Sequence, residues 1–208
     1  KDVIICTPTP RGEINPYILV ASDIAGADEI YTVGGAQAVA AMAFGTVAVP
    51  RVDKIVGPGN MYVAIAKKLM FGQVDIDMIA GPSEILIIAD DTADPTFVAM
   101  DLLSQAEHDE EAAVVLVTPS NILAEKVLKG IKSEMKRLSR REVIQRSLIN
   151  HGLIIITKDI QEAVDLANEI APEHISLQVS QPMKLLKGIK NAGAIFLGSY
   201  TPQTMGDY

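Results

Sequence analysis

The chain has 208 residues, of which 49% are hydrophobic and 21% are charged, with a net charge of -8 and a pI near 4.9. This composition is typical of a globular protein with enough apolar mass for one large or two small cores, and it excludes the disordered and fibrous classes. The acidic balance argues against a nucleic-acid partner. The densest basic stretch, residues 132–141, is interpreted as a solvated helix face.

The single cysteine, Cys6, excludes an internal disulfide and a cysteine-rich metal site, and it fits a cytoplasmic protein. No run approaches about 18 consecutive apolar residues and no signal-peptide pattern is present, so no membrane partner is expected. The sequence enters a strand almost directly after Lys1 and stops after "TPQTMGDY" without a closing element. We therefore interpret the chain as a piece of a longer protein.

Short β-branched runs alternate with helical patterns, which indicates an α/β fold of βαβ units, with parallel strands and helices on both faces. The predicted strands are Val3–Cys6, Glu29–Val33, Lys54–Val56, Asp75–Ile79, Glu84–Ala89, Ala113–Thr118, Gly152–Thr157, His174–Val179 and Ala194–Leu197. Asn15–Pro16 and Asp94–Pro95 predict helix starts, because a side-chain oxygen can accept from free N–H groups where proline has none. Helix ends are predicted at three glycines: Gly26, Gly45 and Gly72.

The segment "DIDMIAGPSEILIIAD", residues 75–90, breaks this alternation, because only "AGPS" separates its two strand-like runs. We interpret it as a crossing between domains. The prediction is two Rossmann-like parallel-sheet domains, residues 1–82 and 83–208, with a cleft between them and with the fold incomplete at both ends.

Three loops of small residues suggest where a ligand could bind. "VGGAQA", "VGPGN" and "AGPSE" each combine small residues with one amide or hydroxyl side chain, namely Gln37, Asn60 and Ser83. Ligands of parallel sheets collect where strands end and helix N-termini begin, and the three loops are predicted at that edge. None of them is the G-x-G-x-x-G fingerprint of dinucleotide-binding proteins, so spacing alone does not identify a nucleotide site. Together they predict a small-molecule cleft.

The stretch "DLLSQAEHD", residues 101–109, places Gln105 and His108 three residues apart near the end of a helix predicted from Asp94 to Glu107. On a helix the two side chains would share a face, and an amide oxygen with an imidazole nitrogen suits zinc. Taken alone, the pair is more typical of a polar helix end, where His108 would interact favourably with the helix dipole. Both interpretations stay open at this point.

"APEHIS" places Glu173 beside His174 at the start of a strand. Histidine titrates near neutral pH and a neighbouring carboxylate can tune it for proton transfer, although such a dipeptide is more often a surface pair. His151 receives no role. Cys6 lacks a basic neighbour in the sequence and is interpreted as a small buried residue rather than a nucleophile.

Taken together in order, "GGAQAVAAMAFGT", "VDKIVGPGN", "DIDMIAGPSEILIIAD", "DLLSQAEHD", "APEHI" and "GDY" resemble the histidinol dehydrogenases over essentially the whole chain. The resemblance implies an enzyme of histidine biosynthesis that contains zinc and uses NAD. It would oxidise L-histidinol through the aldehyde to L-histidine and reduce two NAD molecules in turn. Zinc would hold and orient the substrate rather than change its own oxidation state.

The resemblance also implies roles for single residues. The zinc ligands would be Gln105, His108 and Asp207 of the "GDY" motif, and these side chains would also lie against the substrate. His174 would be the general base and a substrate contact, and Glu173 would activate water for the second oxidation. Two further assignments follow from matching positions: Gln37 and Asn60 would contact NAD, and Ser83 would contact the substrate.

The family enzyme is about twice as long as this chain. Its tail would supply a further zinc-ligand histidine and a substrate-binding glutamate to the site of a partner subunit, so a complete active site would require a homodimer. Catalysis by the 208 residues alone is therefore not expected. Two alternatives stay open: a related zinc- and NAD-dependent dehydrogenase of another polar alcohol, and a non-catalytic fragment that keeps only the ligand cleft. An unrelated flavodoxin-like binding protein would leave "SQAEH" and "GDY" unexplained.

Overall fold

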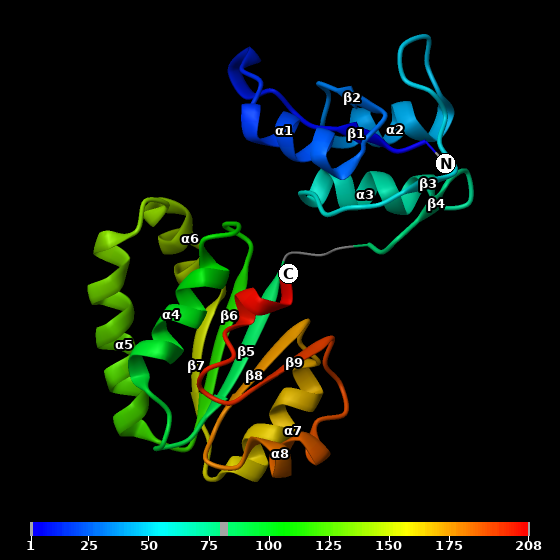
Figure 1. The fold of residues 1–208 in the computed structure, drawn as a ribbon. Helices are drawn as coiled ribbons and strands as arrows, with labels where there is room; N and C mark the ends of the chain where they lie inside the picture. The colour runs from blue at the N-terminus through cyan, green and yellow to red at the C-terminus, as the bar shows by residue number, and fades with distance from the viewer. Residues whose placement is uncertain (1, 80–82, 208) are drawn as a thin grey trace. The chain divides into compact units, whose positions relative to one another are not determined.

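The computed structural model describes residues 2–79 and 83–207, which divide into two compact units, Lys1–Gly81 and Pro82–Tyr208. Each unit has its own hydrophobic core. The strands of each unit are drawn as arrows in Figure 1. None of the helices in the described ranges is both long and apolar enough to span a bilayer.

The second unit is built on a five-stranded parallel sheet in the order β7-β6-β5-β8-β9. Its strands are β5 (Glu84–Ala89), β6 (Ala113–Thr118), β7 (Gly152–Ile156), β8 (His174–Gln178) and β9 (Ala194–Leu197). β5 lies in the centre, and its run "ILIIA" is buried on both faces, as expected for a central parallel strand. Because all five strands run the same way, they begin at one edge, here called the amino edge.

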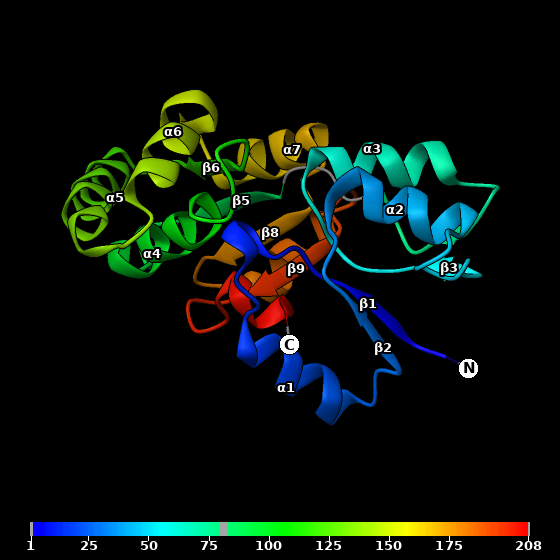
Figure 2. The ribbon, with the colours of Figure 1, turned by 90° about the horizontal axis from the view of Figure 1, so that it is seen from above.

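Helices cover both faces of this sheet. They are α4 (Pro95–Ala106), α5 (Asn121–Glu134), α6 (Arg141–His151), α7 (Ile160–Ile170) and α8 (Pro182–Leu185), with 3-10 turns η2 (Met135–Arg137), η3 (Leu186–Gly188) and η4 (Gln203–Asp207). Ile85 and Ile87 pack against the layer of α4, α5 and α6, whereas Leu86 and Ile88 pack against α7. The alternation of β5 therefore separates two cores, and Figures 1 and 2 show the two helical layers on opposite sides.

The first unit is smaller and its strands form two separate parallel pairs. β1 (Ile4–Cys6) pairs with β2 (Glu29–Tyr31), and β3 (Lys54–Ile55) pairs with β4 (Asp75–Ile76). The helices are α1 (Pro16–Ala25), α2 (Gly35–Phe44) and α3 (Met61–Met70), after the 3-10 turn η1 (Pro10–Gly12). α2 and α3 contact each other and lie side by side in Figures 1 and 2. A small core, including Val39, Ile55 and Ile76, joins them to the second strand pair.

All nine predicted strands form, in the predicted order along the chain, and several of them are shorter than predicted. β4 ends at Ile76 rather than Ile79. The Asp77 N–H still donates to the Ile55 carbonyl oxygen at 3.3 Å, but the Gly57 N–H donates to the Asp77 side chain and not to a strand carbonyl. The helix starts are confirmed: Asn15 accepts from Tyr17 N at 2.9 Å, and Asp94 accepts from Thr96 N at 2.7 Å. Two of the predicted end glycines, Gly26 and Gly45, are C-caps, whereas Gly72 lies one residue beyond the cap of α3.

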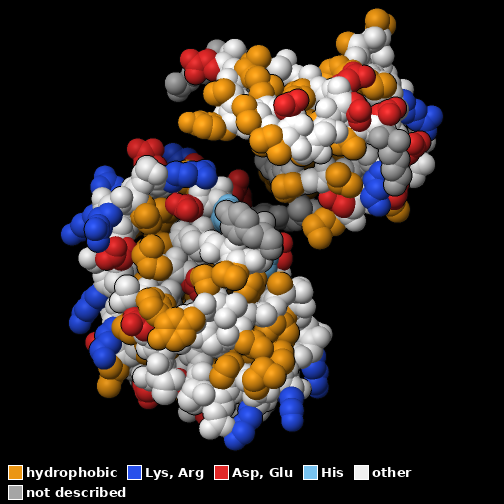
Figure 3. All heavy atoms as spheres, in the orientation of Figure 1, with side chains coloured by type: hydrophobic (Ala, Val, Ile, Leu, Met, Phe, Trp, Pro, Cys, Tyr) orange, Lys and Arg blue, Asp and Glu red, His pale blue; other side chains and the backbone are white. Residues whose placement is uncertain are grey.

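The basic stretch of residues 132–141 does not form one helix face. It runs through the end of α5, through η2 and into the start of α6. Lys132, Lys136, Arg137 and Arg140 are exposed. Figure 3 shows Lys and Arg side chains on the outer side of this helical layer, with acidic side chains among them. The stretch is solvated, as the sequence indicated, and its charges are mixed.

Candidate active site

Several predicted site residues lie at the amino edge of the five-stranded sheet. His174 is the first residue of β8, and it lies between Ile85 of β5 and Ala194 of β9 in the register. Ser83 directly precedes β5. α4 must carry the chain back to this edge, because Ala113 at the start of β6 pairs with Glu84 at the start of β5. The end of α4, with Gln105, therefore comes to the same edge as His174.

This location corrects one expectation. The "AGPSE" loop was predicted at the carboxyl ends of the strands, where ligands of parallel sheets usually bind. Residues 80–82 lie outside the described part, but Ser83 precedes β5 and so lies at the opposite, amino edge. The sequence pattern could not show this, because a loop that enters a strand across a domain crossing has the same composition as one that leaves a strand.

Glu173 and His174 form a pair that is held by the start of β5. The Glu173 Oε2 atom accepts a hydrogen bond from the Glu84 backbone N–H at 3.3 Å and lies 3.9 Å from His174 Nδ1. The His174 side chain is 17% exposed, and its ring centroid lies 5.8 Å from that of Phe196. His174 Nδ1 is buried without a hydrogen-bond partner in the described part of the chain. A proton exchanged with an incoming molecule would therefore pass through Nε2.

Gln105 is the most unusual residue of α4. Its side chain is fully buried, and neither its amide nitrogen nor its amide oxygen finds a hydrogen-bond partner among residues 2–79 and 83–207. An unsatisfied buried amide costs about 1–3 kcal/mol, so folding alone does not favour it here. The amide oxygen is a donor atom that zinc accepts. Gln105 therefore fits the metal-ligand role that the resemblance implies.

His108 follows the helix rather than belonging to it. α4 ends at Ala106, and the His108 backbone N–H donates to the Gln105 carbonyl oxygen at 3.2 Å. The step of three residues from Gln105 to His108 is therefore spanned by a turn and not by the helix alone. The His108 side chain is exposed at this turn. It is held by main-chain bonds and by Arg140, whose guanidinium donates to the His108 carbonyl oxygen at 3.4 Å. The imidazole forms no hydrogen bond or ion pair within the described part of the chain, so it could turn toward a metal.

Asp207 is the last residue of η4, which contacts α4. The side chain of Asp207 lies outside the described part. Its neighbour Gly206 lies against Phe196, so closely that a Cβ atom added at Gly206 would be 2.9 Å from the Phe196 ring. Phe196 in turn contacts His174. The backbone of η4 is therefore close to the proposed base. Among the side chains that the structure describes, no three from His, Cys, Asp or Glu lie close enough together to hold a metal ion.

A buried polar cluster lies one helical turn before Gln105, and the sequence analysis missed it. Asp101 is 6% exposed and accepts from Gln178 Nε2 at 2.9 Å. Burial raises the pKa of Asp101 to about 6, against hydrogen bonds from the Gln203 backbone N–H and the Gln178 amide, which lower it. Gln178 and Gln203 are also buried. The sequence held one indication of this burial: Asp101 and Gln105 follow Val98 at helical intervals, which places all three on the buried face of α4.

The two loops of the first unit lie where the sequence predicted, after β2 and β3 and before α2 and α3. Gln37 is exposed in the first turn of α2, next to Gly35. Asn60 is the N-cap of α3, and its side-chain oxygen accepts from Val63 N at 3.2 Å. That bond leaves the amide NH₂ of Asn60 available to a ligand. Both residues lie at helix N-termini, where backbone N–H groups favour anionic groups such as a pyrophosphate.

The histidinol dehydrogenase family profile matches residues 1–208, the whole chain. Histidinol dehydrogenases from Bacillus cereus and Aquifex aeolicus are 53% and 55% identical to it over 208 residues. Each match covers 100% of this chain and 48% of the relative. The chain therefore spans about half the length of these curated relatives.

A crystal structure of histidinol dehydrogenase from Elizabethkingia anophelis matches with a TM-score of 0.91 at 39% identity, over 99% of this chain and 48% of that one. A point mutant of propionaldehyde dehydrogenase from Clostridium phytofermentans matches at 0.52 and 12% identity, over 88% of this chain and 55% of that one, which is a likeness of fold alone. The family profile over the full length of the sequence shows that this chain belongs to the histidinol dehydrogenase family.

Proposed function

We propose that the full-length protein catalyses the NAD-dependent, zinc-dependent oxidation of L-histidinol to L-histidine. The observation that carries this proposal is the placement of Gln105, fully buried with an unsatisfied amide, at the same sheet edge as His174. A buried amide without a partner is costly in a protein that binds nothing there, and it is understandable in one that binds a metal. The family name supports histidinol as the substrate. The zinc of this proposal comes from the resemblance of the sequence motifs.

Gln105, His108 and Asp207 would hold zinc. The ion, when bound, supplies a positive centre on which the imidazole and amino nitrogens of histidinol can be oriented. The resemblance to the family implies one further protein ligand, a histidine of the family's tail. We propose that a partner subunit of a homodimer completes the set, and sedimentation of the full-length protein tests the dimer.

His174 would act on the substrate hydroxyl. NAD, when bound, would accept the hydride of the carbinol carbon, and His174 Nε2 would take the hydroxyl proton as the aldehyde forms. Glu173 would take a proton from the water that adds to the aldehyde. A second NAD would accept the hydride of the resulting hydrate, and loss of a proton would leave the carboxylate. Burial of the His174 side chain and the neighbouring Phe196 ring would limit rotation of the imidazole. Gln37 and Asn60 would hold the dinucleotide, and Ser83 would contact the substrate.

The test of this function is His174→Asn in the full-length protein. We expect zinc content and NAD affinity to be kept, while turnover of histidinol falls by roughly 100-fold or more, the usual effect of losing a general base. The matched control is His151→Asn, because His151 also pairs with a glutamate, Glu111, at 3.2 Å, but it precedes β7, which β6 and β5 separate from β8 in the sheet. Near-normal turnover of His174→Asn would remove this residue from the mechanism.

The metal assignment is tested separately with His108→Ala. Because one imidazole nitrogen is lost from the ligand set, we expect the purified variant to contain much less than stoichiometric zinc. Stoichiometric zinc in His108→Ala would contradict the assignment. Turnover of other polar amino alcohols at rates comparable to histidinol would point instead to a related dehydrogenase with a different substrate.

A further inference from the structure

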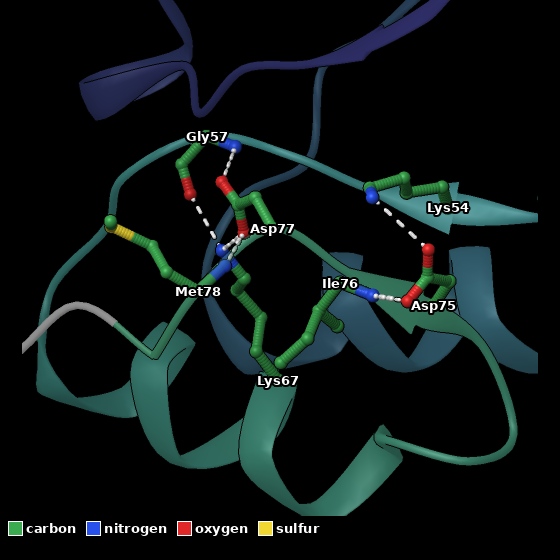
Figure 4. Close-up of polar contacts among 7 residues, drawn as sticks. All are labelled: Lys54, Gly57, Lys67, Asp75, Ile76, Asp77 and Met78. Atoms are coloured by element: carbon green, nitrogen blue, oxygen red, sulfur yellow. Dashed lines mark hydrogen bonds and ion pairs between the residues drawn. The ribbon is translucent and has the colours of Figure 1, made fainter.

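A buried ion pair lies beneath the "VGPGN" loop of the first unit. Lys67 of α3 is only 2% exposed, and its ammonium group pairs with the Asp77 carboxylate, which follows β4 and is 30% exposed (Figure 4). Burying a lysine is costly, and an apolar side chain of the same length would pack in its place at less expense. We therefore attribute the presence of a lysine at this position to its contacts with Asp77 and Gly57.

Both members of the pair bind the backbone of Gly57. The Lys67 ammonium donates to the Gly57 carbonyl oxygen at 2.9 Å, and the Asp77 carboxylate accepts from the Gly57 N–H at 2.7 Å. Figure 4 shows the two contacts converging on Gly57 from the helix and from the strand end. Gly57 has φ 115°, a conformation that favours glycine. The pair thus fixes both polar groups of the residue at which the loop leaves β3.

Asp77 is held in its ionised form. Burial opposes its ionisation, but hydrogen bonds from Lys67 and from the N–H groups of Gly57 and Met78 outweigh burial, and the pKa of Asp77 lies well below its usual range. The carboxylate also accepts from Met78 N at 2.6 Å. Charge-assisted bonds of this kind are stronger than neutral ones, so the two hydrogen bonds from Lys67 and Asp77 should restrict motion of the Gly57 backbone.

The far end of the loop is fixed as well. Asn60 caps α3, the helix that also carries Lys67. Residues 57–60 are therefore tied to one helix at both ends, and the loop is ordered before any ligand arrives. An ordered loop has less conformational entropy to lose on binding, which increases affinity.

We propose that Lys67 and Asp77 are positioning residues for dinucleotide binding, which act by holding the backbone of residues 57–60 in the conformation that presents Asn60 to NAD. This inference rests on the proposed function. In this proposal neither Lys67 nor Asp77 contacts NAD itself. Their effect would be on affinity for NAD, and the zinc and base residues of the second unit would not depend on them.

The same strands offer a matched control. Lys54 of β3 and Asp75 of β4 form a second ion pair at 3.0 Å, with side chains 51% and 58% exposed, and Figure 4 shows it beside the first. It joins β3 to β4, and in the described part of the chain neither side chain forms a hydrogen bond with Gly57 or with the loop. An exposed pair contributes little, so its removal should matter little.

The experiment compares Asp77→Asn and Asp75→Asn in the full-length enzyme. We expect the KM and the Kd for NAD to rise about tenfold or more in Asp77→Asn, because one charge-assisted contact to Gly57 is lost. Zinc content, KM for histidinol and kcat at saturating NAD should stay near wild type. Asp75→Asn should bind NAD within about twofold of wild type. This split between NAD affinity and the other constants is not expected of general destabilisation.

A double variant, Lys67→Met with Asp77→Asn, keeps the proposal testable if the single variant unfolds. Removing both charges leaves no unpaired buried ion, so thermal stability should recover, whereas NAD affinity should stay low and hydrogen exchange of residues 57–60 should increase. Wild-type NAD affinity in a folded single or double variant would overturn the positioning role alone. Absence of NAD binding by wild type would overturn the proposed function and this role with it.

Discussion

Asp101 allows a quantitative test of the buried polar cluster. In the metal-free protein, Asp101→Asn removes an ionisable group that is 6% exposed and keeps its shape. The pKa of Asp101 is raised by burial from 3.8 to about 6. The folded state therefore binds this proton more tightly than the unfolded chain. Its contribution to the free energy of unfolding is fully present below about pH 4 and is lost as the pH rises to about 6 and above.

The magnitude follows from the two pKa values. Each pH unit between them corresponds to about 1.4 kcal/mol, so the whole loss is about 3 kcal/mol, of which about 1.4 kcal/mol falls between about pH 5 and about pH 7.5. In Asp101→Asn this loss is absent. The asparagine oxygen can accept from the Gln203 N–H. Its NH₂ can donate to Gln178 Oε1 once the Gln178 amide turns over, since Nε2 faces Asp101 in the wild type and Oε1 has no partner in the described part of the chain.

The assay is urea unfolding followed by circular dichroism at the two pH values, with wild type and variant compared at each. Other titrating groups cancel in this double difference. We expect Asp101→Asn to gain about 1.4 kcal/mol on wild type between the lower and the higher pH. The control is Asp90→Asn at the opposite sheet edge, where hydrogen bonds from Ser180 and Thr92 outweigh burial and lower the pKa. A pH-independent difference between wild type and Asp101→Asn would refute the reasoning.

Three further predictions concern the site and its supporting core. Gln105→Leu should abolish zinc binding. It should also raise the free energy of unfolding of the metal-free protein by about 1 kcal/mol, because a buried unsatisfied amide is removed. A variant that is less stable than wild type in denaturant titration would argue against this. Leu103→Ala, at a fully buried position of α4, should lower the free energy of unfolding by about 2–5 kcal/mol, and a loss below about 1 kcal/mol would mean that the core collapses around it. The 208-residue chain alone should bind zinc weakly and form no NADH from histidinol, because the proposed ligand set would lack one histidine and Asp207 is next to the chain end. Turnover within about tenfold of the full-length enzyme would contradict that expectation.

The order and direction of the elements followed from the sequence. The β-branched runs predicted nine strands, and Asn15 and Asp94 predicted two helix starts, because capping and strand propensity act through neighbours along the chain. The motif residues Gln105 and His174 were also identified from the sequence, through the resemblance to the family. Their roles as metal ligand and base stay predictions.

Other features depend on contacts between residues far apart in the sequence. In "AKKLM" the sequence does not distinguish Lys67 from Lys68, yet the fold buries the first beside Asp77 and leaves the second exposed. Asp101 acquires its raised pKa from burial among β8 and η4, and Ser83 lies at the amino edge because β5 starts there. Local pattern fixes which elements form, since their hydrogen bonds and caps are local. Burial, charge pairing and the edge at which residues meet were decided by packing between distant segments, which only the tertiary structure contains.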